Sequence, residues 1–208
     1  MKGICFIEPL FHAVVNGSKT QTRRTFKEQQ QGCFVPTDDG YSDGHYTLHK
    51  PRYKVGEVLY LKEPYYLANY QGGLMGLELK KAVKYKYGTM NENFEWQWKN
   101  KLFMPEKYAR YFIKITAVRC EPLQDISDRD CFDEGIKQTE FRYEFGDVLQ
   151  LYSVGNIVSE TSVRDAFAEL IDKISGKGTW ESNPYVWVYD FELIKQPSNK
   201  NTLNFSHL

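Results

Sequence analysis

Apolar residues recur at helical spacing in three stretches of the chain. The clearest spans residues 163–174, where a threonine or a serine can cap the first turn and a glycine follows the last. A shorter stretch spans residues 9–15, and a third begins after Ser127 and ends at Glu134, directly before a glycine. These patterns predict one long helix and two short ones.

Alternating or continuous apolar positions predict strands elsewhere in the chain. They cover residues 2–7, 58–61, 84–87, 109–118 and 185–194. We expect the strand at 109–118 to pair with the strand at 58–61. Strands that alternate with a few helices predict an α+β fold, a small mixed β-barrel with peripheral helices and an inserted β-hairpin.

The chain is long enough for one domain with a real core. It has 208 residues, of which 41% are hydrophobic and 15% are aromatic. We expect a single domain over residues 1–194 and a flexible, polar tail over residues 195–208. Insertions are expected at about 27–50, 64–101 and 137–160. The first insertion is rich in Gln, Gly, Asp, Ser and His, which favours a long loop with at most a hairpin.

The composition favours a cytoplasmic protein with neither a metal nor a cofactor. No apolar run reaches the roughly 18 residues of a membrane helix, and the first strand is too short for a signal-peptide core. The four cysteines contain no C-x-x-C pair, which favours reduced thiols. Cys33, His45 and His49 come nearest to a metal cluster, but they lack a fourth ligand.

Charge is distributed unevenly although the formal net charge is zero. Residues 1–120 carry a surplus of eight positive charges, and residues 121–208 carry a surplus of eight negative charges. This asymmetry predicts a basic face beside an acidic one, which suits a local phosphate-binding patch. Internal neutralisation within one domain explains the same distribution.

The insertion at 64–101 is aromatic and basic. Lys84 and Lys86 alternate with tyrosines, which predicts a hairpin strand with a turn at residues 91–93. Basic residues interleaved with aromatic ones can stack bases while they neutralise phosphates. The pattern is equally typical of an exposed hairpin whose aromatic side chains cover the barrel.

A basic, hydroxyl-bearing segment follows the first predicted helix. Residues 16–24 read NGSKTQTRR, and Gly17 stands where a helix C-cap is expected. The chain should leave the helix here as a turn or a short strand, a position that often carries binding groups. These side chains can converge on an anionic or carbonyl-bearing group, although a solvated basic turn has the same composition.

The segment contains the pattern G-x-K-T-x-T-x-R, formed by Gly17, Lys19, Thr20, Thr22 and Arg24. This pattern resembles the signature of ASCH domains, a branch of the PUA-like superfamily that is associated with RNA and modified nucleosides. Four further stretches match the family in the same order: residues 53–63, Met104-Pro105 with Arg110, residues 123–136 and residues 183–188. The chain resembles the larger bacterial and phage-type members, and this resemblance implies a PUA-like β-barrel.

The resemblance also implies a reaction. Small ASCH enzymes with a similar motif remove the acetyl group from N4-acetylcytidine, and by that resemblance Lys19 is the proton acceptor, Thr22 the nucleophile and Glu134 the proton donor. A threonine hydroxyl needs an adjacent base, and a lysine acts as one only when burial or a nearby cation lowers its pKa. Arg23 and Arg24 supply such a cation. Lys19 and Thr22 converge only if the segment turns, because they face opposite ways along a regular strand.

Two functions compete with hydrolysis. In a pure binding site, cations hold phosphate while an aromatic ring stacks a base. The candidates are the cations Lys19, Arg23 and Arg24, the rings of Tyr60, Tyr65 and Trp98, and the further ligand-binding residues Thr20, Glu63 and Arg110. Alternatively the chain is a non-catalytic protein-interaction module. We favour binding of RNA or a modified nucleoside, with single-stranded nucleic acid included and no membrane partner; the oligomeric state stays open.

Overall fold

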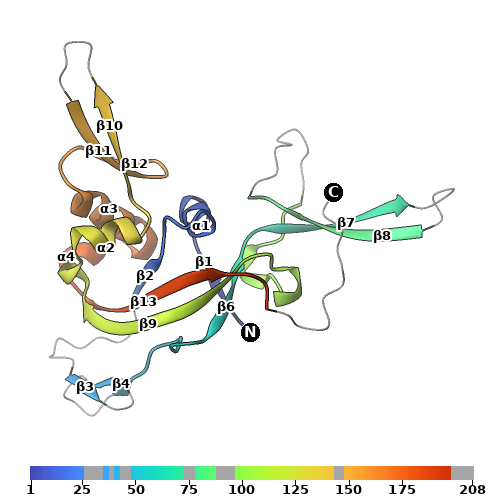
Figure 1. Cartoon of the computed structure of the whole chain (residues 1–208), viewed down its shortest axis with the longest axis horizontal. Coiled ribbons are helices and arrows are strands. Elements are labelled where there is room, and N and C mark those ends of the chain that lie inside the picture. Colours follow the sequence, from blue (N-terminus) through green and yellow to red (C-terminus); the bar gives the residue numbers. More distant parts are fainter. Residues whose placement is uncertain are drawn as a thin grey trace. The chain divides into compact units, whose positions relative to one another are not determined.

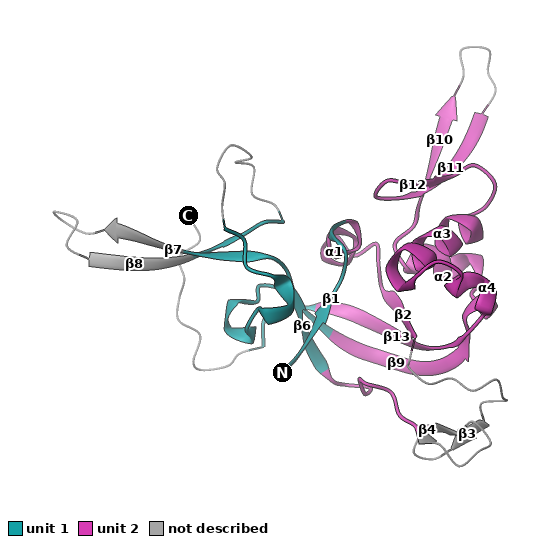
Figure 2. Ribbon diagram, turned by 180° about the vertical axis from the view of Figure 1, so that it is seen from behind, with its two compact units in different colours: residues 1–8, 58–113, 194–208 teal, residues 9–57, 114–193 magenta. Residues whose placement is uncertain are grey.

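The computed structural model describes residues 1–25, 35–37, 40–42, 48–72, 78–87, 97–142 and 148–197. The chain divides into two compact units. Unit 1 comprises residues 1–8, 58–113 and 194–208, and unit 2 comprises residues 9–57 and 114–193 (Figure 2). Each unit therefore combines segments that lie far apart in the sequence.

Unit 1 consists mainly of strands. They are β1 (Lys2–Cys5), β6 (Val58–Lys62), β7 (Tyr65–Gly72) and β8 (Glu78–Tyr85), and two 3-10 turns follow at Lys101–Phe103 and Glu106–Tyr108. β1 runs parallel to β6, and β7 and β8 form an antiparallel hairpin in which Tyr65 lies opposite Tyr85 (Figure 1). Lys99 adds an isolated antiparallel bridge to Tyr65.

A small hydrophobic core lies within unit 1. Its buried members are Tyr60, Tyr65, Met104, Ala109 and Phe112. Partly buried side chains of the β7–β8 hairpin pack against them. The hairpin therefore contributes to a core, as expected for structural cover.

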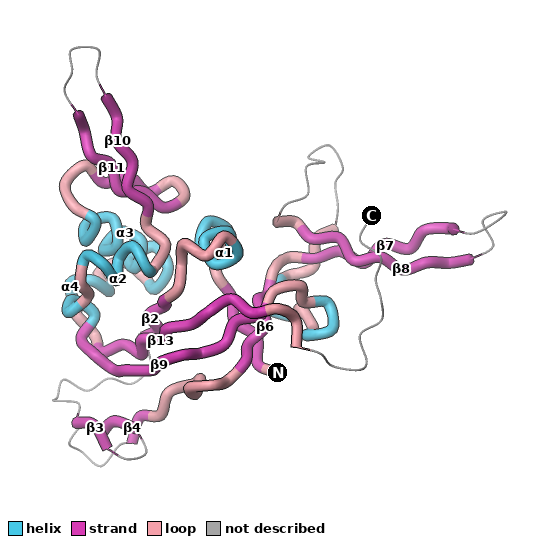
Figure 3. Tube along the Cα trace, viewed as in Figure 1, coloured by secondary structure: helices cyan, strands magenta, loops and turns pink. Residues whose placement is uncertain are grey.

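Unit 2 contains the α-helices and most of the remaining strands. Figure 3 distinguishes helices from strands by colour. In chain order these elements are α1 (Glu8–Val15), β2 (Gln21–Thr25), β3 (Val35–Thr37), β4 (Gly40–Ser42), β5 (Leu48–His49), β9 (Phe112–Pro122), a 3-10 turn (Leu123–Asp125), α2 (Asp128–Asp133), β10 (Lys137–Arg142), β11 (Val148–Val154), β12 (Ile157–Ser159), α3 (Val163–Ser175), α4 (Thr179–Ser182) and β13 (Tyr185–Ile194). Helix α3 packs against α2, α4, β11 and β12. Three of these elements cross the boundary between the units: Glu8 of α1, residues 112–113 of β9 and Ile194 of β13 belong to unit 1.

The largest sheet has the strand order β1-β6-β9-β13-β2. Its edges are β1 and β2, so within the described residues this sheet is open and does not close into a barrel. Three smaller sheets have the orders β10-β11-β12, β3-β4-β5 and β7-β8. The α+β fold is thus confirmed, whereas the predicted barrel is not.

The three predicted helices form where the sequence places them. Helix α3 begins after Ser162, whose side chain caps the first turn, and Gly176 with a φ of 114° follows its end. Helix α2 begins after Ser127, which forms a capping box with Asp130, and Glu134 is its C-cap. No helix in the described part of the chain is long and apolar enough to span a membrane.

Two strands differ from the prediction. The strand expected at 109–118 spans Phe112–Pro122, because a 3-10 turn ends just before it and Ala109 still bonds back to that turn. It neighbours β6, as expected. The strand expected at 84–87 is the end of β8, which pairs with β7. The turn expected at 91–93 lies outside the described residues.

The polar insertion at 27–50 is more regular than predicted where it is described. Strands β3, β4 and β5 form a small antiparallel sheet there, in place of a loop with at most one hairpin. Cys33 and His45, two of the residues weighed as metal ligands, lie outside the described residues, as do residues 198–208 of the predicted tail.

Candidate functional site

Lys19 lies where backbone hydrogen bonds join two segments of unit 2. Helix α1 ends before Gly17, whose left-handed backbone (φ 80°) turns the chain, and the Lys19 amide donates back to the Ala13 carbonyl oxygen at 2.9 Å. The Thr20 amide then donates to the carbonyl oxygen of Asp133, the last residue of α2, at 2.9 Å. These bonds fix the motif against the end of α2 before strand β2 begins.

The side chains of Lys19 and Glu134 form a buried ion pair. The Nζ atom lies 2.5 Å from Oε2, and it also donates to the carbonyl oxygens of Glu134 at 2.8 Å and of Gln21 at 2.7 Å. The Lys19 side chain is 0% exposed and the Glu134 side chain is 5% exposed. Three acceptors thus match the three donors of a charged lysine. Two of the three residues that the resemblance assigns to catalysis are in direct contact.

Burial lowers the pKa of Lys19 from its usual value, because the charged form loses its hydration. The charge and the hydrogen bond of Glu134 oppose this shift, while the charges of Arg24 and Arg23 add to it. The net direction is downward. A lysine with a lowered pKa beside a specific carboxylate is typical of functional sites, although structural ion pairs show it too.

Gly135 allows Glu134 to approach the motif. Its φ of 100° is a conformation that residues with a side chain rarely adopt. A Cβ atom added there would lie 3.2 Å from Ala13 Cβ and 3.3 Å from Lys19 Cβ. The glycine that ends α2 therefore also permits the close contact between α2 and the end of α1.

Arg23 connects the Lys19–Glu134 pair to further charged groups. Its buried guanidinium lies 2.6 Å from Glu121 Oε1, 3.2 Å from Asp130 Oδ2 and 3.5 Å from Glu134 Oε1. It also donates to the side-chain oxygen of Gln21. Within the described residues its Nε atom is buried without a hydrogen-bond partner. The charge of Arg23 is thus compensated inside the protein.

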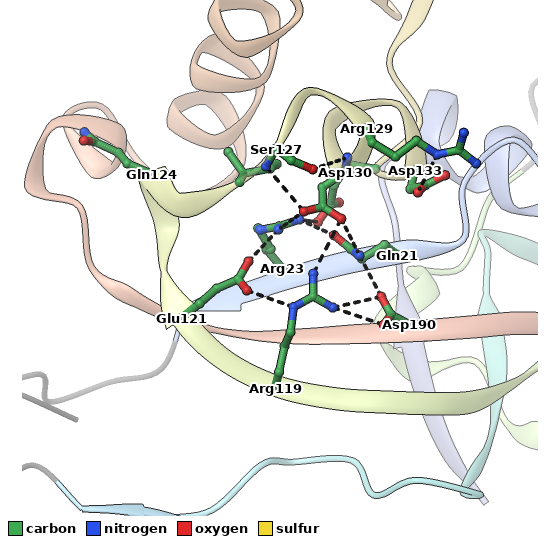
Figure 4. A network of polar contacts seen from close by, with 12 residues as sticks. Gln21, Arg23, Arg119, Glu121, Gln124, Ser127, Arg129, Asp130, Asp133 and Asp190 are labelled. Carbon is green, nitrogen blue, oxygen red and sulfur yellow. Dashed lines mark hydrogen bonds and ion pairs between the residues drawn. The ribbon is translucent and has the colours of Figure 1, made fainter. Parts of the chain in front are cut away.

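A polar network extends from Arg23 towards solvent (Figure 4). We call it the Arg23 network, and its members are Gln21, Arg23, Arg119, Glu121, Asp130 and Asp190. The Gln21 amide donates to Asp130 at 3.0 Å and to Asp190 at 2.7 Å. Arg119 donates to Glu121 at 2.8 Å and to Asp190 at 3.1 Å. Since the side chains of Arg119 and Asp190 are 36% and 32% exposed, the outer end presents both donors and acceptors.

The remaining motif residues lie at and along β2. Thr22 is buried opposite Tyr189 of β13, and alternation along the strand places it on the face opposite to Arg23. The approach of its hydroxyl to the Lys19 ammonium, which a base and nucleophile require, stays a prediction. Thr20 is exposed and Arg24 is partly exposed, so both can meet a ligand from solvent.

The three other predicted ligand residues lie in unit 1. Glu63 is buried, and its two oxygens accept hydrogen bonds from Nε of Arg110 at 2.8 Å and from Nη2 at 2.7 Å. Nη2 also donates to the Tyr87 carbonyl oxygen at 2.6 Å. Tyr60 is a core residue whose hydroxyl donates to the Met104 carbonyl oxygen at 3.0 Å, and burial raises the pKa of this hydroxyl. Its ring therefore packs inside unit 1.

Sequence reasoning missed four charged members of the Arg23 network. They are Arg119, Glu121, Asp130 and Asp190. A signal was present, because Asp190 interrupts an apolar strand and Arg119 and Glu121 flank a cysteine near the end of another. Charges at partly buried strand positions require partners. The identity of those partners depends on how the strands are ordered in the sheet.

Comparison of the chain with models of protein families, with curated proteins and with solved structures found no match. The resemblance to ASCH domains therefore rests on the motifs. Within the described residues, no group of three or more His, Cys, Asp or Glu side chains could hold a metal ion. The groups that meet at this site are the buried Lys19, the carboxylate of Glu134 and the charged side chains of the Arg23 network.

Proposed function

We propose that this chain is an ASCH-type protein of the PUA-like superfamily that binds RNA or a modified nucleoside. The observation that carries the proposal is the 2.5 Å contact between Lys19 and Glu134, which joins two motifs 115 residues apart in the sequence. Burying an ion pair costs hydration free energy that an apolar pair would not cost. Such a pair is weak evidence for stability and better evidence for a functional role.

The groups around this pair favour a nucleoside over a phosphate as the ligand of unit 2. Lys19 and Arg23 already contact carboxylates, so a phosphate would have to compete with bound anions. The outer end of the Arg23 network offers a guanidinium and carboxylates instead. These groups can donate to and accept from the edge of a base or the hydroxyls of a ribose.

A second candidate function is removal of an acyl group from an N4-acetylcytidine-like nucleoside. The lowered pKa of Lys19 favours it, because a lysine can accept a proton only from its neutral form. In the roles that the resemblance implies, the Thr22 oxygen attacks the acyl carbonyl carbon while Lys19 takes the hydroxyl proton. Glu134 protonates the departing amine, and water then releases the acyl group from Thr22.

Binding is tested with the purified full chain and a panel of nucleosides that contains cytidine and several N-acylated derivatives. We expect calorimetry to detect binding of at least one acylated nucleoside. Glu134→Gln should weaken this binding by on the order of tenfold to a hundredfold, the range for one hydrogen bond to a charged group. Glu140→Gln is the matched control, since it makes the same change at an exposed position of β10. The control should bind as the wild type does.

Thr22→Ala separates the two candidate functions. If the site only binds, this variant keeps its affinity and neither protein forms a product that mass spectrometry detects. If the site hydrolyses, Thr22→Ala still binds but releases no acyl group, and adding Lys19→Met costs little more because base and nucleophile act as a unit. A folded wild-type protein that binds no nucleoside of the panel would contradict the proposal. A non-catalytic protein-interaction module would then be the remaining alternative.

A further inference from the structure

Several tyrosine rings of unit 1 have a cation over them, and three of these ring–cation pairs lie on neighbouring segments. The pairs, with the distance from the cation to the ring centroid, are Arg110 and Tyr85 (4.2 Å), Lys107 and Tyr108 (5.0 Å), and Lys99 and Tyr65 (6.0 Å). All three distances lie within the range of cation–π attraction. We call these six residues the aromatic–cation row.

The row is one continuous feature. Tyr65 lies opposite Tyr85 in the hairpin and bridges to Lys99 on its other side, so these three side chains share one face of the strands. The rings of Tyr65 and Tyr108 are 5.6 Å apart between centroids. The Tyr85 hydroxyl donates to the Tyr108 carbonyl oxygen at 2.8 Å. The three ring–cation pairs therefore lie on neighbouring segments of unit 1.

Glu63 orients the guanidinium at one end of the row. The Glu63 side chain is 1% exposed and the Arg110 side chain is 27% exposed, so the carboxylate anchors a cation that still reaches solvent. Nε and Nη2 are bound by Glu63 and by the Tyr87 carbonyl oxygen. Among the described residues, none accepts a hydrogen bond from Nη1 of Arg110. The two N–H groups of Nη1 thus remain for an external acceptor.

The charge of unit 1 favours an anionic partner. Its residues include 12 Lys and Arg against six Asp and Glu, a surplus of +6, whereas unit 2 holds 15 against 21. Lys99 and Lys107 are exposed. Cations that alternate with aromatic rings suit a single-stranded nucleic acid, because the cations neutralise phosphates while the rings stack unpaired bases. A duplex keeps the faces of its bases stacked inside the helix, so these faces cannot stack on the tyrosine rings.

We propose that the aromatic–cation row binds single-stranded nucleic acid. Arg110 Nη1 and the ammonium groups of Lys99 and Lys107 contact phosphate oxygens, and the ring of Tyr108 stacks on a base. The row belongs to unit 1 alone and does not depend on the nucleoside site proposed for unit 2. RNA and DNA share the chemistry that the row recognises, so both are tested as ligands.

The double variant Lys99→Ala/Lys107→Ala tests the phosphate contacts, and it leaves the buried Glu63 and its partner intact. Fluorescence anisotropy measures binding of labelled single-stranded RNA, single-stranded DNA and a duplex across a range of salt concentrations. Each phosphate contact adds about 0.7 to the log–log salt slope for a single strand, so the variant should lose roughly 1.4 from the slope. The affinity at low salt should fall by on the order of tenfold.

Lys137→Ala/Lys177→Ala is the matched control, because it removes two exposed lysines of unit 2 and changes the net charge equally. This control should keep the wild-type slope. Equal losses in the two double variants would overturn the proposal, since the effect would then follow net charge. Tighter binding of the duplex than of either single strand would overturn it as well.

Tyr108→Leu tests stacking separately from charge. The variant should bind single strands more weakly with an unchanged salt slope, because the phosphate contacts remain. Circular dichroism checks that the fold is kept. Unchanged single-strand affinity in this variant and in the double lysine variant would overturn the row as a binding site. Nucleoside binding by unit 2 is measured alongside, and its persistence would show that only the row has failed.

Discussion

Units 1 and 2 each bury a glutamate beside a cation, but the two pairs leave different groups available. In unit 2, Lys19 is enclosed by Glu134 and two backbone carbonyl oxygens, and Arg23 lies 3.5 Å from the second carboxylate oxygen. In unit 1, Glu63 binds one edge of Arg110, and the Arg110 side chain remains 27% exposed. The first pair ends in a neutralised network, and the second presents a cation to solvent.

The shape of the cation explains this difference. An ammonium group is compact, and three acceptors can enclose it completely, so its burial changes its pKa. A guanidinium is a planar fork with two edges, so a carboxylate can saturate one edge while the other edge stays open. A buried glutamate can therefore influence proton transfer in one unit and aim a positive charge in the other.

The largest expected effect is the loss of stability in Arg110→Met. This change removes the group that bonds both oxygens of the buried Glu63, and breaking a buried ion pair costs about 3–5 kcal/mol of unfolding free energy. Urea denaturation at neutral pH measures the loss. The double variant Arg110→Met/Glu63→Leu should recover most of it, because an apolar pair can replace a buried ion pair. A double variant no more stable than the single one contradicts this reasoning.

Lys19→Met should cost less than Arg110→Met in the same measurement. Arg23 Nη1 remains 3.5 Å from Glu134, so part of the compensating charge is kept. The double variant Lys19→Met/Arg23→Met should then lose more unfolding free energy than the two single variants lose in sum, because both cations share one carboxylate. An equal or larger loss for Lys19→Met than for Arg110→Met would break the contrast between the units.

A smaller effect is expected on ligand affinity. Each of two glutamate variants should weaken the binding of one ligand and leave the other unchanged. Glu134→Gln should weaken nucleoside binding by on the order of tenfold to a hundredfold and leave single-strand binding unchanged. Glu63→Gln should weaken single-strand binding by a smaller factor, because Arg110 loses its charged anchor, and leave nucleoside binding unchanged. Calorimetry and anisotropy on the same two proteins decide the matter. If both variants weaken both ligands, the two units do not act separately.

The smallest expected effect is on the pH dependence of stability. Burial raises the pKa of Tyr87 in unit 1 and of Tyr189 in unit 2 to about 12 each. Because these values exceed the unfolded value near 10, the contribution to stability is complete below about pH 10 and is lost as the pH rises towards 12. Tyr87→Phe and Tyr189→Phe should each flatten the decline of the unfolding free energy in that window. Curves parallel to the wild type would refute the assignment.

Tyr189→Phe should also affect stability at neutral pH. The Tyr189 hydroxyl accepts a hydrogen bond from the Arg52 amide at 3.0 Å, and its removal leaves that amide without this acceptor. Tyr189→Phe should therefore cost about 1 kcal/mol or more of unfolding free energy at neutral pH. A thermal melt of Tyr189→Phe beside the wild type measures this loss.

Local patterns were sufficient for the helices, for some of the strands and for the motif. The apolar period and the capping residues place α3, and the capping serine and following glycine place α2 and its end at Glu134, because caps and turns depend on a few neighbouring residues. The match of strand β13 to residues 185–194 has the same origin. The start of β9 was missed because Ala109, the first residue of the predicted strand, bonds back to the 3-10 turn at Glu106–Tyr108, and the strand begins only at Phe112.

The sequence by itself therefore determined helices α1, α2 and α3, strand β13 and the residues of the motif, but it did not predict the sheets β3-β4-β5 and β10-β11-β12. Only the tertiary structure decided which charges meet: Lys19 with Glu134, Arg110 with Glu63, and Arg119 with Asp190. It also decided that Arg23, which was expected to hold a phosphate, forms ion pairs with the carboxylates of Glu121 and Asp130 inside unit 2. The physical reason is that exposure and pairing depend on the order and register of strands distant in sequence, which no local pattern encodes.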